Sequence, residues 1–166
     1  MKTLIRALGC IALIFTPAYA FWIARPIEQR VIESDCIVFA KFDGYSTVTP
    51  NDLFETQLGL FVLERAVKGT AEETLLVHGE KTTMCVPMTD FSSMQKGATY
   101  LLFLGSADDT KTRRALEASV FAVTDGKLMW SDPGEKSSQL RTLQQVERSI
   151  RSIAKAPLSQ RSKIRS

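Results

Sequence analysis

The sequence is poor in the residues that most enzyme and metal sites require. It contains one histidine, His78, and three cysteines, Cys10, Cys36 and Cys85, among 166 residues. A nucleophilic triad needs a base held beside a serine or cysteine, and no such motif surrounds His78. The chain also lacks a nucleophile elbow, a phosphate-binding glycine loop, a two-histidine metal spacing and a Cys-x-x-Cys pair. We therefore expect no catalytic residues, no cofactor and no enzymatic activity.

Long hydrophobic runs are missing as well. The longest apolar stretch near the amino terminus, Ala7 to Phe15, is shorter than the roughly 20 residues that a membrane-spanning helix needs. Two basic residues precede it and Ala18-Tyr19-Ala20 follow it, which is the pattern of an export signal. Cys10 as a lipoprotein attachment site is the alternative, but the apolar segment before it is too short. The sequence thus predicts a cleaved signal over residues 1–20 and a periplasmic or secreted protein.

The charge is distributed unevenly along the remaining chain. Residues 21–140 carry 12 basic and 17 acidic side chains, whereas residues 141–166 carry seven basic side chains and one acidic side chain. Such an asymmetry indicates either an anionic partner or a solvated helix face followed by a frayed terminus. The length fits one domain over residues 21–156, and we expect residues 157–166 to be disordered.

Two cysteines, Cys36 and Cys85, remain after removal of the signal. An even number of cysteines in an exported chain favours a disulfide. Closing a loop of about 50 residues would stabilise the fold by on the order of 4 kcal/mol in the chain-entropy model. A structural Cys36–Cys85 bridge is therefore predicted, with two free thiols in an apolar core as the alternative.

The middle of the chain predicts strands separated by turn residues. Asp43-Gly44 and Asp125-Gly126 are expected turns, Gly59 is an expected bulge, and residues 80–96 are an expected crossing loop with one helical turn. The stretch Thr99 to Leu104 is continuously apolar and predicts a strand buried on both faces. The six expected strands cover residues 31–42, 56–67, 73–78, 99–104, 118–123 and 127–130.

One amphipathic helix is predicted near the carboxyl terminus, over residues 137–154. Asp132-Pro133-Gly134 precede it, Ser137 or Ser138 is the expected cap, and Pro157 follows it. Its apolar residues recur at spacings of three and four, so they form a stripe that the sheet or a partner must cover. The stripe consists of Leu140, Leu143, Val146, Ile150 and Ile153.

The order of these motifs resembles the netrin-like or tissue-inhibitor-of-metalloproteinase superfamily, and in particular its exported bacterial members. The resemblance covers about residues 31–130 and rests on "SDCIVFAKF", "LFVLERAVKG" and "FSSMQKGATYLLFL". It implies an oligonucleotide/oligosaccharide-binding (OB) type barrel of five strands with a helix packed on it. The fold we expect is thus mainly β, a five- to six-stranded OB-like barrel with a C-terminal helix packed against it.

One departure from that superfamily limits what the resemblance implies. Its protease inhibitors bind the protease zinc through a mature amino-terminal cysteine, whereas the mature chain here is expected to begin Phe21-Trp22-Ile23. Protease inhibition therefore cannot be assigned to any residue of this sequence. Similarity of fold alone does not transmit function.

Three kinds of binding site were weighed against simple packing. His78, Met84, Cys85 and Met88 form a soft-ligand set that could hold Cu(I), although methionine also fills gaps in cores. Nucleic-acid binding is not expected, because the aromatic residues of the barrel lie in apolar strand patterns. The basic helix could lie on an anionic membrane with its stripe inserted, although packing on the sheet explains that stripe.

These observations together predict an exported, non-enzymatic binding or protein-interaction module whose partner the sequence does not identify. The alternatives are a periplasmic copper-binding protein that uses the His78, Met84, Cys85 and Met88 segment, and a membrane-surface protein that uses the basic helix.

Overall fold

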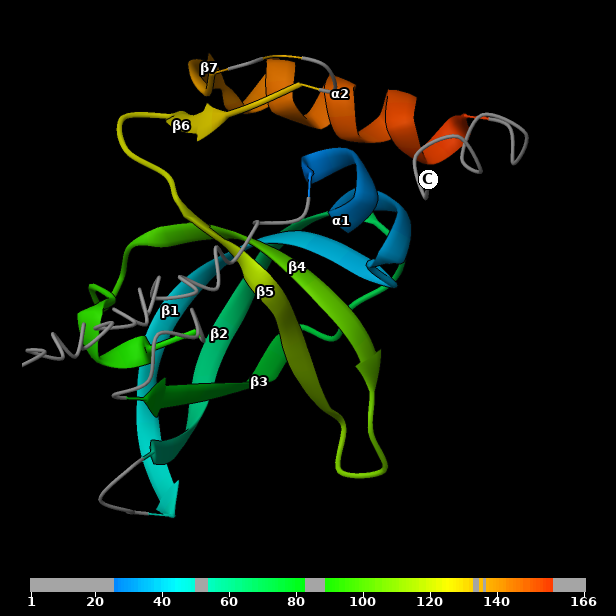
Figure 1. Ribbon diagram of the computed structural model, residues 1–166. Coiled ribbons are helices and arrows are strands. Elements are labelled where there is room, and N and C mark those ends of the chain that lie inside the picture. Colours follow the sequence, from blue (N-terminus) through cyan, green and yellow to red (C-terminus); the bar gives the residue numbers. More distant parts are fainter. Residues whose placement is uncertain (1–25, 50–53, 83–88, 133–134, 136, 157–166) are drawn as a thin grey trace, which may run out of the picture.

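The fold is a closed β-barrel with a layer of helices and a short ribbon on one side (Figure 1). The computed structural model describes residues 26–49, 54–82, 89–132, 135 and 137–156. The predicted signal and the predicted disordered tail lie outside these residues. The elements are α1 (Ile27–Glu33), β1 (Cys36–Thr49), β2 (Phe54–Lys68), β3 (Thr74–Thr82), the 3₁₀ helix η1 (Phe91–Ser93), β4 (Thr99–Ala107), β5 (Thr112–Ala122), β6 (Lys127–Trp130), β7 (Gln139–Thr142) and α2 (Leu143–Lys155).

The barrel consists of five strands in the order β1-β2-β3-β5-β4, and β4 pairs with β1 to close it. Neighbouring strands are antiparallel except for β3 and β5, which pair in parallel at Leu76–Thr112, Val77–Arg113 and His78–Arg114. This five-stranded closed barrel, with α2 packed against it, confirms the predicted OB-like fold class. Strands β6 and β7 form a separate two-stranded ribbon.

Strands β1 and β4 separate two hydrophobic cores. Alternate residues of a strand point to opposite faces, so one set of side chains fills the barrel and the other meets the helical layer. Tyr100, Leu102 and Leu104 of β4 belong to the barrel core, whereas Leu101 and Phe103 pack with Val146 and Ile150 of α2 and Trp130 of β6. All five residues from Tyr100 to Leu104 are buried. The prediction that this stretch is buried on both faces is confirmed.

The first predicted strand was wrong at its start, because residues 27–33 form helix α1. Val31 and Ile32 are β-branched and suggested a strand, yet the end of this helix is held by a contact far away in the sequence. Lys68 Nζ donates hydrogen bonds to the carbonyl oxygens of Val31 at 2.7 Å, Ile32 at 3.3 Å and Ser34. A cation at a helix carboxyl end stabilises it by satisfying unpaired carbonyls.

The Asp43-Gly44 turn was also wrong, because β1 continues through it to Thr49. The register with β2 shifts between Phe42 and Gly44, so Asp43 is an extra residue in a bulge. Gly44 has a φ of 151° and open space where a Cβ would be. The glycine is therefore required by the backbone conformation of the bulge and not by crowding.

The predicted bulge at Gly59 is wrong, because the register with β3 is regular there. The predicted strand over residues 73–78 was too short, because β3 continues through Gly79 to Thr82. The two glycines lie beneath the ring of Phe91, which is fully buried. A Cβ on Gly59 would lie 2.7 Å from Phe91 Cε2, and one on Gly79 would lie 2.6 Å from the same atom. The buried Gln57 holds η1 in place, since its Oε1 accepts a hydrogen bond from Phe91 N at 2.8 Å. Because Gly59 and Gly79 have no side chain, the ring of Phe91 can pack against them and fill this end of the barrel.

Asp125 and Gly126 both have positive φ and form the predicted tight turn. The turn does not join two paired strands, however, because only Thr124 and Lys127 bridge across it and β6 then pairs with β7. The connection between the predicted strands 99–104 and 118–123 is shorter than expected, since β4 runs to Ala107 and β5 begins at Thr112.

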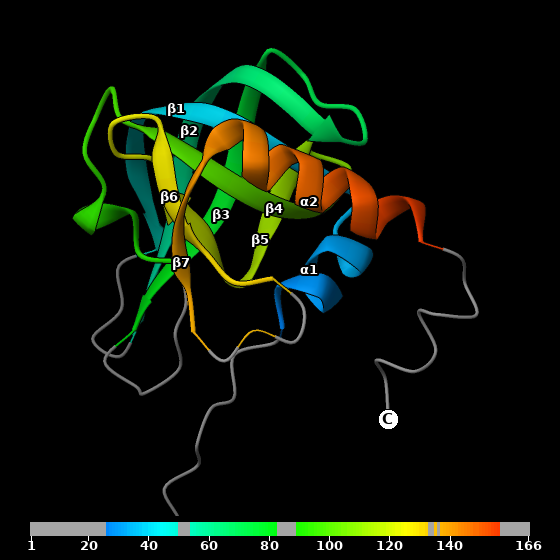
Figure 2. The same ribbon diagram turned by 90° about the horizontal axis from the view of Figure 1, so that it is seen from above.

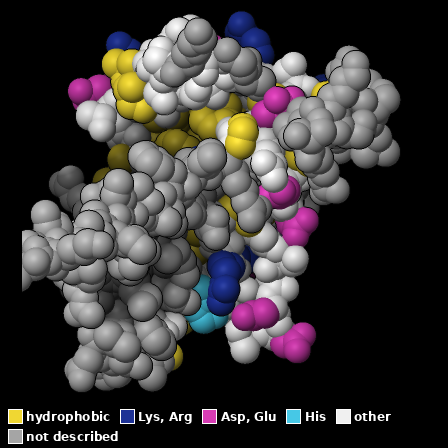
Figure 3. All heavy atoms as spheres, in the orientation of Figure 1, with side chains coloured by type: hydrophobic (Ala, Val, Ile, Leu, Met, Phe, Trp, Pro, Cys, Tyr) yellow, Lys and Arg dark blue, Asp and Glu magenta, His cyan; other side chains and the backbone are white. Residues whose placement is uncertain are grey.

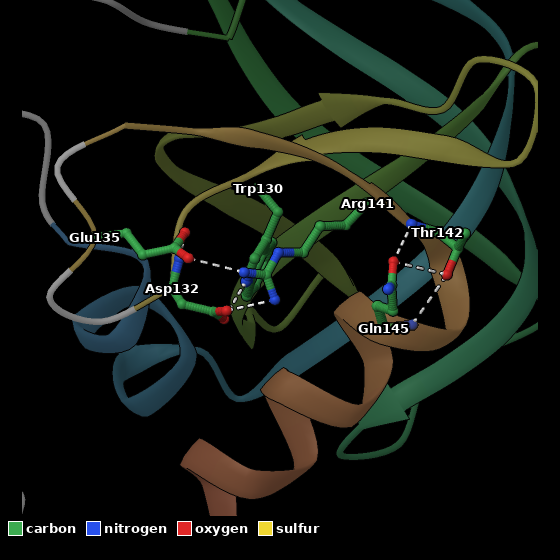
Figure 4. Close-up of polar contacts among 6 residues, drawn as sticks. All are labelled: Trp130, Asp132, Glu135, Arg141, Thr142 and Gln145. Atoms are coloured by element: carbon green, nitrogen blue, oxygen red, sulfur yellow. Dashed lines mark hydrogen bonds and ion pairs between the residues drawn. The ribbon is translucent and has the colours of Figure 1, made fainter.

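The carboxyl-terminal helix begins later than predicted, at Leu143. Residues Gln139–Thr142 form β7, and the cap is Thr142, not Ser137 or Ser138. Thr142 and Gln145 form a capping box in which each side chain receives the other residue's backbone N–H (Figure 4). Val146, Ile150 and Ile153 of the predicted stripe are buried, whereas Leu140 lies on β7 and is 62% exposed. Viewed from above, α1 and α2 lie together on one side of the barrel (Figure 2).

Candidate functional site

The outer surface of β2 and β3 carries an unusual row of aliphatic side chains. Inward positions of β2, such as Phe61, belong to the barrel core, so Leu58, Leu60 and Val62 point outward. Leu76 of β3 pairs with Leu60 and extends the row. Val62 is 42% exposed, and the three leucines are partly exposed. We call this surface, together with His78 and Arg114 at its end, the outer β2–β3 face.

The polar end of the outer β2–β3 face is set by strand pairing. His78 lies opposite Leu58 on β2 and beside Arg114 on β5. Its Nε2 lies 3.9 Å from Asp108 Oδ2, on the turn between β4 and β5. Figure 3 shows the cyan histidine with basic and acidic side chains around it near the lower end of the barrel. The face thus combines an aliphatic row with a mixed charged end.

Asp108 organises the turn beside His78. Its Oδ1 accepts hydrogen bonds from Thr110 Oγ1 at 2.6 Å, from Thr110 N at 2.9 Å and from Thr112 N at 2.9 Å. These bonds, led by that of the Thr110 hydroxyl, hold the pKa of the Asp108 carboxyl below its usual value. Asp108 is therefore ionised and fixed in place where it meets His78.

The predicted copper ligands are only partly described. His78 lies on β3, whereas Met84, Cys85 and Met88 lie outside the described residues. Within the described part of the chain, no group of three or more His, Cys, Asp or Glu residues could hold a metal ion. The permanent charge of Arg114 next to His78 opposes cation binding there. The copper hypothesis stays untested.

Cys36 begins β1 and is fully buried in the barrel core. Its thiol is free in the structure, and Cys85 lies outside the described residues, so the predicted disulfide stays a prediction. Burial raises the pKa of the Cys36 thiol, and the nearby Arg113 opposes this only partly. A buried thiol with a raised pKa is a poor nucleophile.

Arg113 closes the barrel end near Cys36 and was missed by the sequence analysis. It is only 9% exposed, yet it donates hydrogen bonds to the carbonyl oxygens of Gly105 at 3.2 Å and Thr70 at 3.4 Å, and it pairs with Glu72 at 3.5 Å. Its Nε has no hydrogen-bond partner within the described residues. Through these three partners, Arg113 of β5 links β4 to the β2–β3 connection at this end of the barrel. No sequence pattern distinguishes it from the exposed Arg114.

Two further observations concern the aromatic residues of the barrel and the lengths of the helices. The aromatic residues weighed for nucleic-acid stacking, Phe39, Phe61, Tyr100 and Phe103, are all buried in the two cores, so they cannot act as an exposed stacking platform. None of the helices described here is long and apolar enough to cross a membrane.

Comparison with known proteins does not assign a function. No protein-family model matches the chain, and no curated protein matches it significantly. The resemblance to the netrin-like superfamily therefore remains an expectation from the sequence motifs.

Proposed function

We propose that this chain is an exported, non-enzymatic binding module that holds a partner protein on the outer β2–β3 face. The proposal rests on the row of aliphatic side chains on the outer side of β2, which Leu76 of β3 extends. The β2 residues of this row are Leu58, Leu60 and Val62. Strands with one solvated face normally alternate apolar and polar residues. An outward aliphatic row on such a strand is typical of a surface that a partner covers.

The charged end of this face supports the same proposal. Interfaces combine an apolar centre with a polar rim that sets register and specificity. His78, Asp108 and Arg114 lie at one end of the aliphatic row and supply charges of both signs. A protein segment that places apolar side chains over the leucines and a carboxylate near Arg114 would match this arrangement.

The proposal can be tested by site-specific photo-crosslinking in the organism's exported fraction. Thr74 is exposed and pairs with Val62 across the strands, so a benzoylphenylalanine placed at position 74 would contact a partner that covers Val62. We expect a discrete crosslinked product. The Val62→Asp substitution in the same chain should remove it, because a buried unpaired carboxylate at an interface is strongly unfavourable.

Met129→Asp is the matched control. Met129 is also an exposed apolar residue, 53% exposed, but it lies on the β6–β7 ribbon. The crosslinked product should persist in this variant. A product that survives Val62→Asp, or one that forms from position 129 and not from position 74, would place the partner elsewhere and contradict the proposal.

A further inference from the structure

The exposed face of α2 forms a second binding surface, and we propose that it docks on an anionic lipid bilayer by electrostatic contact alone, without insertion. This inference goes beyond the proposed function, because it concerns the exposed face of α2, separate from the outer β2–β3 face, and a different partner. We use the name α2 stripe for six residues on the exposed side of the helix, opposite its apolar residues. They are spaced three and four apart and therefore lie along one side of the helix: Gln144, Glu147, Arg148, Arg151, Ser152 and Lys155.

The α2 stripe is rich in positive charge. It lines an open hollow of about 550 Å³ along the helix and contains three basic residues and one acidic residue. Arg65 of β2 adds a fourth cation, because its Nη2 lies 3.2 Å from Glu147 Oε2. Figure 3 shows Lys and Arg side chains at the top of the molecule, where β7 and α2 lie. The α2 stripe extends over roughly 17 Å, because 11 steps of about 1.5 Å separate Gln144 from Lys155.

Glu147 sets the geometry of this surface. One carboxylate oxygen pairs with Arg151 at 2.8 Å and the other pairs with Arg65. Two guanidinium groups are thus held on either side of a single anion. Arg148 and Lys155 make no ion pair with any described residue, so their charges are available to a partner.

Arg141, which the sequence analysis grouped with the basic segment, does not contribute to this surface. Its guanidinium lies 2.5 Å from Asp132 Oδ2 and 2.9 Å from Glu135 Oε1, and Asp132 also accepts a hydrogen bond from Trp130 Nε1 at 2.9 Å (Figure 4). Two carboxylates neutralise this arginine and tie β7 to the connection between β6 and β7. The positive surface therefore begins on α2.

Insertion into the bilayer is excluded by the packing of the helix. The apolar side chains Val146, Ile150 and Ile153 are buried against the barrel, so the face that an interfacial helix would insert is already covered. The remaining attraction is between cations and lipid headgroups. With Arg65, this surface presents four cations. Clusters of four to eight cations on or beside an amphipathic helix are typical of binding to anionic lipids.

The test is co-sedimentation of the purified chain with vesicles. Vesicles containing about 30% phosphatidylglycerol are compared with pure phosphatidylcholine, at about 10 mM and about 150 mM salt, where the screening length falls from roughly 30 Å to roughly 8 Å. We expect retention on the anionic vesicles at low salt, release at the higher salt, and no retention on the neutral vesicles.

Variants that remove positive charge and a variant that removes negative charge should change retention in opposite directions. Each cation near an anionic surface contributes about fivefold to binding. Arg148→Gln combined with Lys155→Gln should therefore weaken retention about 25-fold, and Glu147→Gln should strengthen it. The matched control is Lys96→Gln combined with Lys111→Gln, which removes the same net charge from two exposed loop positions outside the helical layer and should leave retention nearly unchanged.

Four outcomes would overturn the proposal. The first is no retention on anionic vesicles at low salt, and the second is equal loss in the control and the α2 variants. The third is retention that persists at the higher salt, because this indicates insertion. The fourth is tight binding of soluble inorganic polyphosphate without retention on vesicles, because this would mean that the partner is a soluble polyanion and not a bilayer.

Discussion

The two sides of the barrel wall carry similar outward residues and have different surroundings. On β1 and β4 the outward residues Ile37, Phe39, Leu101 and Phe103 are buried beneath α1, α2 and the ribbon. On β2 and β3 the outward residues Leu58, Leu60, Val62 and Leu76 remain partly exposed. Apolar surface stabilises the fold only where something removes it from water. The first wall therefore stabilises the domain, and the second is available to a partner.

The difference between the walls is the basis of four predictions, taken from the largest expected effect to the smallest. The first compares an aspartate substitution inside the barrel, at Leu102 of β4, with one on the exposed outer side of β2, at Val62. Leu102→Asp places a charge in the barrel core, where Leu102 is fully buried, and should prevent folding because no group there pairs with it. Val62→Asp should remain folded. Circular dichroism and thermal melting of both variants test this, and a folded Leu102→Asp variant would refute the assignment of β4 to the core.

The second prediction concerns the inner side of the exposed wall, which is as tightly packed as the covered wall. In Gly79→Ala the new methyl group would lie 2.5 Å from the carbonyl oxygen of Thr89 and 2.6 Å from Phe91. Overpacking of this kind destabilises a core by about 1–3 kcal/mol. Gly105→Ala is the control, since its nearest contact would be 3.7 Å. Equal urea midpoints for the two variants would contradict the packing of Phe91 on Gly79.

The third prediction concerns α2, which covers the outward residues of β1 and β4. Thr142→Ala removes the side chain that accepts the hydrogen bond from Gln145 N at the start of α2. Loss of such a cap costs about 1 kcal/mol, and Thr142→Ser should restore most of it. Urea unfolding measures the change. If Thr142→Ala and Thr142→Ser are equally destabilised, the capping box is not what fixes the helix start.

The fourth prediction is a small pH effect at the end of the outer β2–β3 face. Because the pKa of Asp108 is lowered in the folded protein, its contribution is complete above the usual aspartate pKa and is lost as the pH falls through the lowered value. The amide signals of Thr110 and Thr112 should shift over that acidic range in an NMR titration. In Asp108→Asn these shifts should disappear, and their persistence would assign them to another group.

The sequence patterns predicted the elements that local periodicity specifies. The continuous apolar run Thr99 to Leu104 was correctly assigned as a strand buried on both faces, and the stripe of Val146, Ile150 and Ile153 was correctly assigned to a helix that packs on the sheet. These two features depend on residues near one another in the chain, or on a pattern that repeats along it. The closed barrel was expected only from the resemblance of the motifs to the netrin-like superfamily.

The errors occurred where a distant contact decides the local structure. Residues 27–33 are helical because α1 packs on α2 and because Lys68 binds its last carbonyls. Leu140 matched the helical spacing, yet it lies on a strand because β6 pairs with β7. Gly59 and Gly79 were interpreted through their own backbone freedom, whereas Phe91, which follows β3 in the chain, explains both of them.

For the candidate binding surfaces as well, the sequence showed which residues are present, and only the tertiary structure showed their surroundings. The run Leu58 to Leu63 is apolar on both faces except for Gly59, so the sequence alone could not tell which of its residues point outward. Likewise, the cations of the carboxyl-terminal segment were visible in the sequence. The pairing of Arg151 with Glu147, and of Arg141 with Asp132 and Glu135, was not.

By itself, the sequence determined the β-rich fold class, the strand at the centre of the two cores and the presence of one amphipathic helix, because these follow from alternation and spacing of apolar residues along the chain. Only the tertiary structure decided which aliphatic face is covered, where each helix begins and which charges are neutralised. These three properties depend on neighbours that are distant in sequence, and burial and ion pairing are set by those neighbours.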